Sequence, residues 1–196
     1  MANEILLHND DTPVVWTGDT QYAVGTYPAN IYAQTHTLTF RGVADNTARQ
    51  GDKADLGSRR PQGYLVKLGL MFAAAPTAGN PVEVYWSSSS SSHPASGNAG
   101  GGSPSNPYVS GVDGTFVPAG GAEADIDEYK RHLDFVGVFA AGNDANNQQV
   151  ANINSYFSPS ERYGQPVIKN DTGQALHAGG SGMFLAFIPV TDEIAS

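Results

Sequence analysis

The chain contains no cysteine. This absence excludes a disulfide scaffold, thiol catalysis and zinc sites built on cysteine. Positive charge is also scarce, since 10 Lys and Arg residues stand against 19 Asp and Glu residues and give a formal net charge of −9. Phosphate backbones repel a chain of this charge, so we expect no nucleic acid among its partners.

Long hydrophobic runs are missing as well. No stretch approaches the roughly 20 apolar residues that cross a bilayer, and we expect no membrane contact. The N-terminus lacks a basic segment and its apolar stretch is only Ile5-Leu6-Leu7, which does not fit a signal peptide. We therefore expect synthesis in the cytoplasm, with extracellular life only through assembly into a larger particle or a non-Sec route.

Short apolar runs with two different faces are what the chain does contain. In the clearest run, residues 64–72, every second side chain is apolar: Tyr64, Val66, Leu68, Leu70 and Phe72. Such alternation is typical of β-strands, whose successive side chains point to opposite faces. Similar runs occur at residues 35–41, 82–86, 133–139, 148–157, 165–169 and 183–190. Roughly eight strands with long connections predict an all-β fold, an antiparallel β-sandwich of jelly-roll or Greek-key type.

Two local features interrupt this pattern. The alternation of residues 133–139 changes phase near Val136, which predicts a bulge or a bend at Gly137. Residues 122–132 are the one segment that suggests a helix, because its acidic residues come early and its basic residues come late, as the helix dipole favours. Within it, Asp127 and Arg131 are spaced to form an ion pair.

The composition divides the chain into an extended N-terminal arm, residues 1–34, and a sandwich domain, residues 35–196. Residues 87–121 form an insertion that begins with six serines and is rich in Ser, Gly and Pro. Such a sequence cannot order itself by burying apolar surface. Two interpretations stay open, a floppy loop and an insertion ordered by a partner subunit.

Candidate catalytic and metal sites are weak. None of the five histidines has the spacing of a zinc motif. Ser181, His177 and Asp171 could be imagined as a triad, but no Gly-x-Ser-x-Gly turn is present and a turn before the last strand explains them as well. The acidic and amide clusters at residues 9–11, 125–128 and 143–147 match no EF-hand pattern. We expect no catalytic, cofactor-binding or metal-binding residues, and no enzyme.

Two further groups of residues allow more than one interpretation. Basic residues gather at Arg41, Arg49, Lys53, Arg59 and Arg60, either as a solvated loop or as a contact patch for an acidic neighbour. The aromatic residues Tyr85, Tyr108 and Tyr156 could stack on sugars, although sandwich proteins also bury tyrosines between subunits.

Four stretches carry a resemblance to a known class of proteins. They are residues 38–44 (LTFRGVA), 55–57 (DLG), 162–170 (RYGQPVIKN) and 187–193 (FIPVTDE). Together they resemble small structural proteins of tailed bacteriophages, over most of residues 36–194. The resemblance implies a virion component, a capsid decoration (cement) protein with a jelly-roll body that acts as a trimer or another oligomer. It brings no catalytic residues with it.

The leading hypothesis is a bacteriophage protein that binds the capsid exterior and reinforces the shell without covalent bonds. Its partners would be the major capsid protein and copies of itself, as a homotrimer. Aromatic residues in otherwise flexible segments need somewhere to be buried, which makes five of them candidate subunit contacts: Trp16, Tyr22, Tyr27, Tyr108 and Phe116. The alternative for each is packing within its own domain. Two other functions stay open, a tail, baseplate or fibre component and a carbohydrate-binding adhesin.

Overall fold

Two antiparallel sheets pack face to face in the computed structural model, which describes residues 13–18, 35–58, 61–103, 106–116, 123–145, 147–179 and 182–190. Sheet A has the strand order β1 (Val14–Trp16), β12 (Phe184–Val190), β4 (Gly63–Leu70) and β10 (Gln149–Phe157). Sheet B has the order β8 (Gly114–Thr115), β2 (Thr47–Gln50), β11 (Tyr163–Asn170), β5 (Pro81–Ser89) and β9 (Asp134–Ala140), and β3 (Ala54–Asp55) also pairs with β11. The predicted all-β antiparallel sandwich is confirmed.

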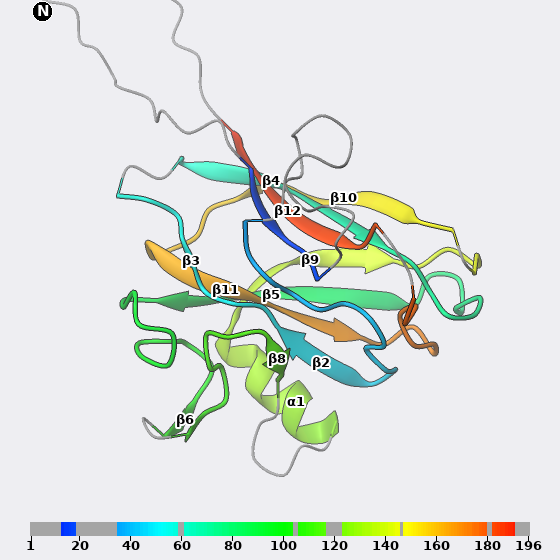
Figure 1. Cartoon of the computed structure of the whole chain (residues 1–196), viewed down its shortest axis with the longest axis horizontal. Coiled ribbons are helices and arrows are strands. Elements are labelled where there is room, and N and C mark those ends of the chain that lie inside the picture. Colours follow the sequence, from blue (N-terminus) through cyan, green and yellow to red (C-terminus); the bar gives the residue numbers. More distant parts are fainter. Residues whose placement is uncertain are drawn as a thin grey trace, which may run out of the picture.

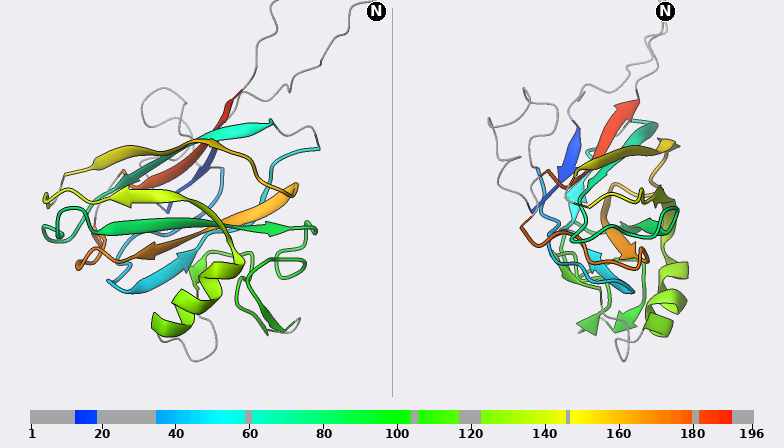
Figure 2. Two further views of the ribbon diagram at one scale, coloured as in Figure 1. Left: turned by 180° about the vertical axis from the view of Figure 1, so that it is seen from behind. Right: turned by 90° about the vertical axis from the view of Figure 1, so that its right-hand side faces the viewer.

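Smaller elements lie against the outer face of sheet B, the face away from sheet A. They are the helix α1 (Glu123–Tyr129), the 3₁₀ turn η2 (Lys130–His132) and the two-stranded pair of β6 (Gly102–Ser103) and β7 (Asn106–Pro107). Figure 1 shows α1 and β6 below sheet B, with sheet A above it. Figure 2 shows the same layers from the back and from the side.

The strands pair in a nested order. When the four strands of two residues each (β3, β6, β7 and β8) are set aside, eight described strands remain. Of these, the first pairs with the eighth, the second with the seventh, the third with the sixth and the fourth with the fifth. This nested order agrees with the expected jelly-roll type, which stays a prediction beside the confirmed antiparallel sandwich.

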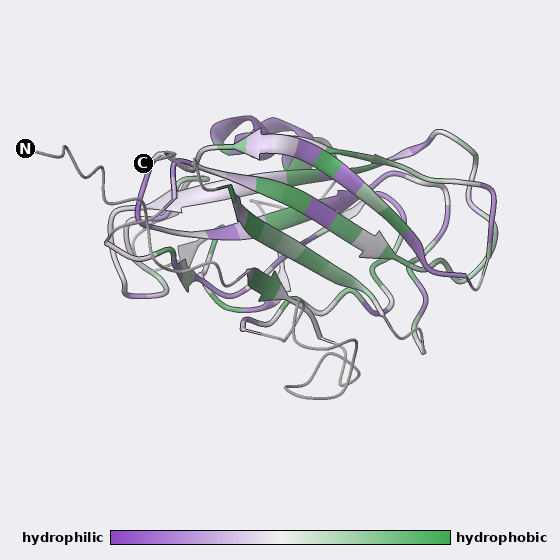
Figure 3. Cartoon of the chain, turned by 90° about the horizontal axis from the view of Figure 1, so that it is seen from above, coloured by the Kyte–Doolittle hydropathy of each residue, from purple (hydrophilic) through white to green (hydrophobic). Residues whose placement is uncertain are grey.

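The core lies between the two sheets and is built from the alternating faces that the sequence indicates. The side chains of Tyr64, Val66, Leu68, Leu70 and Phe72 are all buried, as predicted. Figure 3, a view from the sheet A side, shows apolar and polar residues following one another along the strands. From sheet B, the inner face of β5 contributes its own alternating set to the same core: Val82, Val84 and Trp86.

The sequence predicts a helix, a bulge in β9 and an N-terminal arm. The helix is confirmed, although Asp127 pairs with Lys130 and Lys169 instead of Arg131. The bulge is confirmed too, because Val84 pairs with Gly137 while Tyr85 pairs with Phe135, which leaves Val136 as the extra residue. The arm requires a correction, since β1 is a strand of sheet A and pairs with β12 over residues 14–16. The rest of the predicted arm, residues 1–12 and 19–34, lies outside the described residues.

The two sheets come together along one edge of the sandwich, where β9 of sheet B lies beside β10 of sheet A. The side-chain amide of Asn154 donates a hydrogen bond to the carbonyl oxygen of Val136 at 2.6 Å. Glycine is required opposite this point, because a Cβ atom on Gly137 would lie 2.4 Å from the carbonyl oxygen of Ile153. Two register shifts in β10 also interrupt its alternation, so Ser155 is exposed although Ile153, two positions before it, packs against the core.

A glycine in β11 provides a test of this packing. A Cβ atom on Gly164 would lie 2.4 Å from the indole ring of Trp86, so Gly164→Ala forces the core apart. We expect it to lower the free energy of unfolding by about 1–3 kcal/mol, measured by urea denaturation. Gly114→Ala is the control, because its Cβ atom would have no neighbour closer than 4.0 Å. Equal effects of the two substitutions would contradict the packing described.

Candidate interaction surface

Large apolar side chains exposed to solvent gather on the edge where β9 meets β10. Five such side chains are exposed in the described part of the chain, and four of them lie on these two strands: Phe135, Val138, Val150 and Tyr156, with exposed fractions of 56%, 43%, 51% and 53%. We call these four residues the edge surface. The fifth, Val112, lies elsewhere, with an exposed fraction of 51%. A cluster of this kind marks a contact region more often than single exposed residues do.

The local sequence explains why these side chains face outward. In β10, Ala151 and Ile153 pack against the core, so Val150 and Asn152 take the opposite face. In β9 the bulge at Val136 places both Val136 and Gly137 inside and leaves Phe135 and Val138 outside.

The edge surface is suited to side-chain contacts, not to the addition of another strand. Register shifts occur in both β9 and β10, and bulges on edge strands hinder edge-to-edge pairing. Phe135 is supported from within, because its ring meets that of Tyr85 edge to face with centroids 5.5 Å apart. Phe135 meets Tyr85 on the sheet B side of this edge and Tyr156 lies over Gly63 of sheet A, with exposed polar residues such as Asn152 and Ser155 on the same strands. Protein interfaces also combine apolar and polar side chains.

The Ser- and Gly-rich insertion lies on the outer face of sheet B. We call its described part beyond β5, residues 90–103 and 106–116, the strap. Its underside contributes Val109 and Phe116 to a second apolar cluster with Val167 of β11 and Leu133. Its backbone also bonds to the sheet, from the amide of Ala99 to the carbonyl oxygen of Ser88 at 2.9 Å and from Phe116 to Ala48 at 3.1 Å. Contacts within the chain therefore order the described part of the insertion, and no partner subunit is needed to hold it.

A single lysine fastens one end of the strap. The ammonium of Lys53 donates to Ser89 Oγ at 2.8 Å and to three carbonyl oxygens of the strap at 2.7–3.0 Å, those of Ser91, His93 and Ser96. No carboxylate is among these partners. Burial lowers the pKa of the Lys53 ammonium to about 8, while hydrogen bonds to four oxygens favour its charged form.

An aspartate fastens the other end. Asp113 accepts hydrogen bonds from Arg49 Nε at 3.1 Å and Nη2 at 2.9 Å, and from the backbone amide and hydroxyl of Thr39. Burial alone would raise the pKa of Asp113, but the hydrogen bonds from Arg49 and Thr39 outweigh it and hold the pKa below its usual value. The strap thus closes onto residues more than 60 positions away in the sequence.

Ion pairs anchor α1 to the same face. Lys169 of β11, with a side chain only 4% exposed, contacts Asp127 and Asp171 at 2.8 Å each. Lys130 joins Asp127 to Glu83 of β5, and the Tyr85 hydroxyl donates to Glu83. Burial, together with Glu83, raises the pKa of Tyr85 to about 12. These ion pairs hold the helix in place, and Asp127, with a side chain 40% exposed, is the most accessible of their members.

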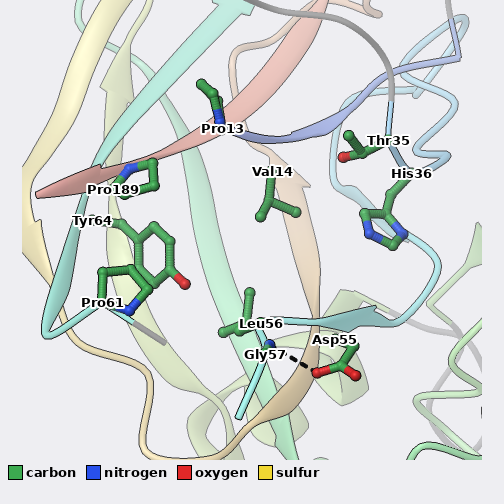
Figure 4. Close-up of a pocket in the computed structure, with 10 residues that line it drawn as sticks. All are labelled: Pro13, Val14, Thr35, His36, Asp55, Leu56, Gly57, Pro61, Tyr64 and Pro189. Carbon is green, nitrogen blue, oxygen red and sulfur yellow. Dashed lines mark hydrogen bonds between the residues drawn. The ribbon is translucent and has the colours of Figure 1, made fainter. Parts of the chain in front are cut away.

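A pocket of about 320 Å³ opens at the end of the sandwich beside β1 and β3. Figure 4 shows its apolar side, formed by three prolines and Tyr64, facing Thr35 and His36. Its polar groups already pair within the chain. Asp55 binds Arg162 through two bonds of 2.7 Å, and Thr35 Oγ1 accepts from the amide of Val15. His36 stacks on Trp16 and lies 3.5 Å from Asp52.

The candidate contact aromatics that the structure describes, Trp16, Tyr108 and Phe116, do not lie together on an exposed surface. Trp16 is fully buried, with its ring 5.1 Å from that of Phe187 and 5.7 Å from that of Trp86. Phe116, on the underside of the strap, is fully buried against sheet B. For these two the contact prediction requires correction, because their own domain covers them. Tyr108 is half-buried against Tyr129, with ring centroids 4.7 Å apart. Tyr22 and Tyr27 lie outside the described residues.

The other predicted groups are also accounted for. His177 Nδ1 accepts from the amide of Gly179, Asp171 pairs with Lys169, and Ser181 lies outside the described residues. Among the residues that the structure describes, no three His, Asp or Glu side chains gather as metal ligands would. Arg49 and Lys53 of the basic cluster bind the strap, while Arg59 and Arg60 are not described. Of the tyrosines expected to be exposed, Tyr156 is and Tyr85 is not.

Sequence reasoning missed three of the four residues of the edge surface. A signal was present for Val150 and Tyr156, because they share a face with polar Asn152 and not with Ala151. For Phe135 and Val138 the exposure depends on β9 being an edge strand, which no local pattern reveals.

Searches against protein families, curated proteins and solved structures find no match to this chain. The resemblance to phage structural proteins therefore stays a prediction. None of the helices in the described residues is long and apolar enough to span a membrane.

The lowered pKa of Asp113 predicts how acid affects stability. The unfolded chain takes up this proton at a higher pH than the folded chain, so the stabilisation is complete above the unfolded pKa of about 4 and is lost as the pH falls below it. Asp113→Asn should lower the free energy of urea unfolding by about 2 kcal/mol at pH 7, and by less at pH 3. Asp144→Asn, at an exposed position, is the control. Equal losses at both pH values would contradict the role given to the Asp113 charge.

Proposed function

We propose that this chain is a structural protein of a bacteriophage virion that decorates and stabilises the capsid shell through non-covalent contacts. The edge surface is the observation that carries the proposal. Four large apolar side chains are exposed on the strands β9 and β10, whereas the other large apolar residues that the structure describes, Val112 apart, are buried or partly buried. Burial of such a surface against another protein lowers the free energy of the system.

The edge surface would be the centre of a larger contact. A stable interface buries at least about 1,000 Å² in total, which is more than these four side chains provide alone. The polar residues around them would complete it as a rim, and the central aromatic residues would contribute most of the binding energy. Phe135 suits this role, because Tyr85 packs beneath it and limits its freedom before binding.

The fold and the resemblance support the same proposal. The four stretches that resemble phage structural proteins fall largely on the sandwich itself, including β11 and the second half of β12. In this proposal the partners are the major capsid protein and further copies of this chain, assembled as a homotrimer on the outside of the shell. The contact would need no chemical step, because its energy comes from burial of apolar area.

Substitution of the two aromatic residues tests the proposal. The double variant Phe135→Ser with Tyr156→Ser should weaken binding to shells of the phage that encodes this chain by about 30-fold or more, as loss of interface hot spots does. Co-sedimentation with shells that lack the protein measures the affinity. The matched control is Val112→Ser, which removes an equally exposed apolar side chain away from the edge surface and should leave binding unchanged.

Two results would count against the proposal. The first is unchanged shell binding by a folded double variant, which would move the contact to another surface. The second is a wild-type protein that binds no shell. Cryo-electron microscopy of the particle adds the position of the protein, and density on the tail would replace the capsid assignment with the tail alternative.

A further inference from the structure

Two glutamines lie on the outer face of sheet B in opposite hydrogen-bonding states. Gln50 of β2 is 3% exposed, and its amide is fully used by the strap. Its Nε2 donates to the carbonyl oxygens of Tyr108 and Thr115 at 3.2 and 3.1 Å, and its Oε1 accepts from the amide of Ser110 at 2.7 Å. Gln165 of β11 is 0% exposed, and neither its Nε2 nor its Oε1 has a hydrogen-bond partner among the described residues.

Gln165 lies on the face that the strap covers. It shares that face with Val167, two positions along β11, which packs in the cluster that includes Val109 and Phe116 of the strap. Its partner across the sheet is Ser87, whose hydroxyl donates to the carbonyl oxygen of Ala99 in the strap. The closed strap therefore seals a primary amide away from water without giving it a partner, which is unfavourable.

Closure of the strap also has two opposing effects on the Lys53 ammonium, which gains hydrogen bonds and loses water. Closure of the strap gives this ammonium three carbonyl acceptors beside Ser89 Oγ of β5, but it also removes part of its water. No carboxylate compensates for that loss, since all four acceptors are neutral. Closure thus gains from these hydrogen bonds and from the burial of Val109 and Phe116, and it is opposed by a desolvated charge and an unpaired buried amide.

We propose that the strap is poised to open, as one unit, from a sandwich that stays folded. Gln50 and Lys53 hold it closed, whereas Gln165 favours the open state, in which its amide can bond to water. Opening of this kind is a local unfolding equilibrium with a free energy below that of the whole domain. The proposal is independent of any role in a virion, because every contact it uses lies within one chain.

Hydrogen exchange of the purified full-length protein tests this balance. The reporters are the backbone amides of Ala99 and Phe116, which bond to sheet B only while the strap is closed. Gln50→Met removes three bonds to the strap and should speed their exchange about tenfold or more. Gln165→Met keeps the length of the side chain but removes the unpaired amide, and should slow their exchange about fivefold. The two substitutions exchange the same residue types on the same face, so each is the control for the other.

The ratio of strap exchange to core exchange separates opening from general loss of stability. Amides of β4 and β12 serve as the core reference, because these strands lie inside sheet A. Lys53→Met provides a second variant, with faster strap exchange and an unchanged core expected. Unchanged or faster strap exchange in Gln165→Met would overturn the proposal, since it would mean that the amide is already satisfied. Strap and core amides that exchange together in the wild-type protein would overturn it as well.

Discussion

Close packing of aromatic rings between the two sheets is the constraint on which the rest of the structure depends. Phe187 of β12 lies at its centre, with ring centroids 5.1–5.7 Å from those of Trp16, Tyr64, Trp86 and Phe157. These rings come from five strands, and the inner face of β11 must present Gly164 to make room for them. The sandwich can close only when all five strands are in register, so the position of each sheet edge, and of everything attached to the outer faces, follows from this centre.

The outer face of sheet B shows how the chain orders a segment that has little apolar content. Single polar side chains supplement the few apolar contacts made by Val109 and Phe116, with Lys53 at one end of the strap and Asp113 at the other. Lys53 donates to backbone carbonyl groups of the strap, and Asp113 accepts from Arg49 and Thr39. These specific bonds give the strap one defined position. Its polar attachment also explains why it forms a separate layer and does not merge with the core.

Much of the fold can be predicted from local patterns, because alternation reports directly on which face of a strand is buried. The face of residues 64–72, the bulge at Val136 and the helix before β9 all follow in this way. The inclusion of β1 in the sandwich does not, since three residues are too short for a periodic signal. The order of the strap and the edge surface depend on sheet order and on contacts between distant residues such as Lys53 and Ser96. Contacts between residues so far apart in the sequence cannot be inferred from the pattern of about ten neighbouring residues.

The nested strand order has a consequence for how the chain is made. Strand β4 lies between β12 and β10, so both of its neighbours belong to the last quarter of the chain. During translation, β4 leaves the ribosome long before either neighbour exists, with both of its hydrogen-bonding edges open. Strand β1 can pair only later still, because its partner β12 ends at residue 190. The nascent chain therefore carries the apolar strand β4 unpaired until β10 emerges, which makes this a slow-folding topology that would benefit from chaperones.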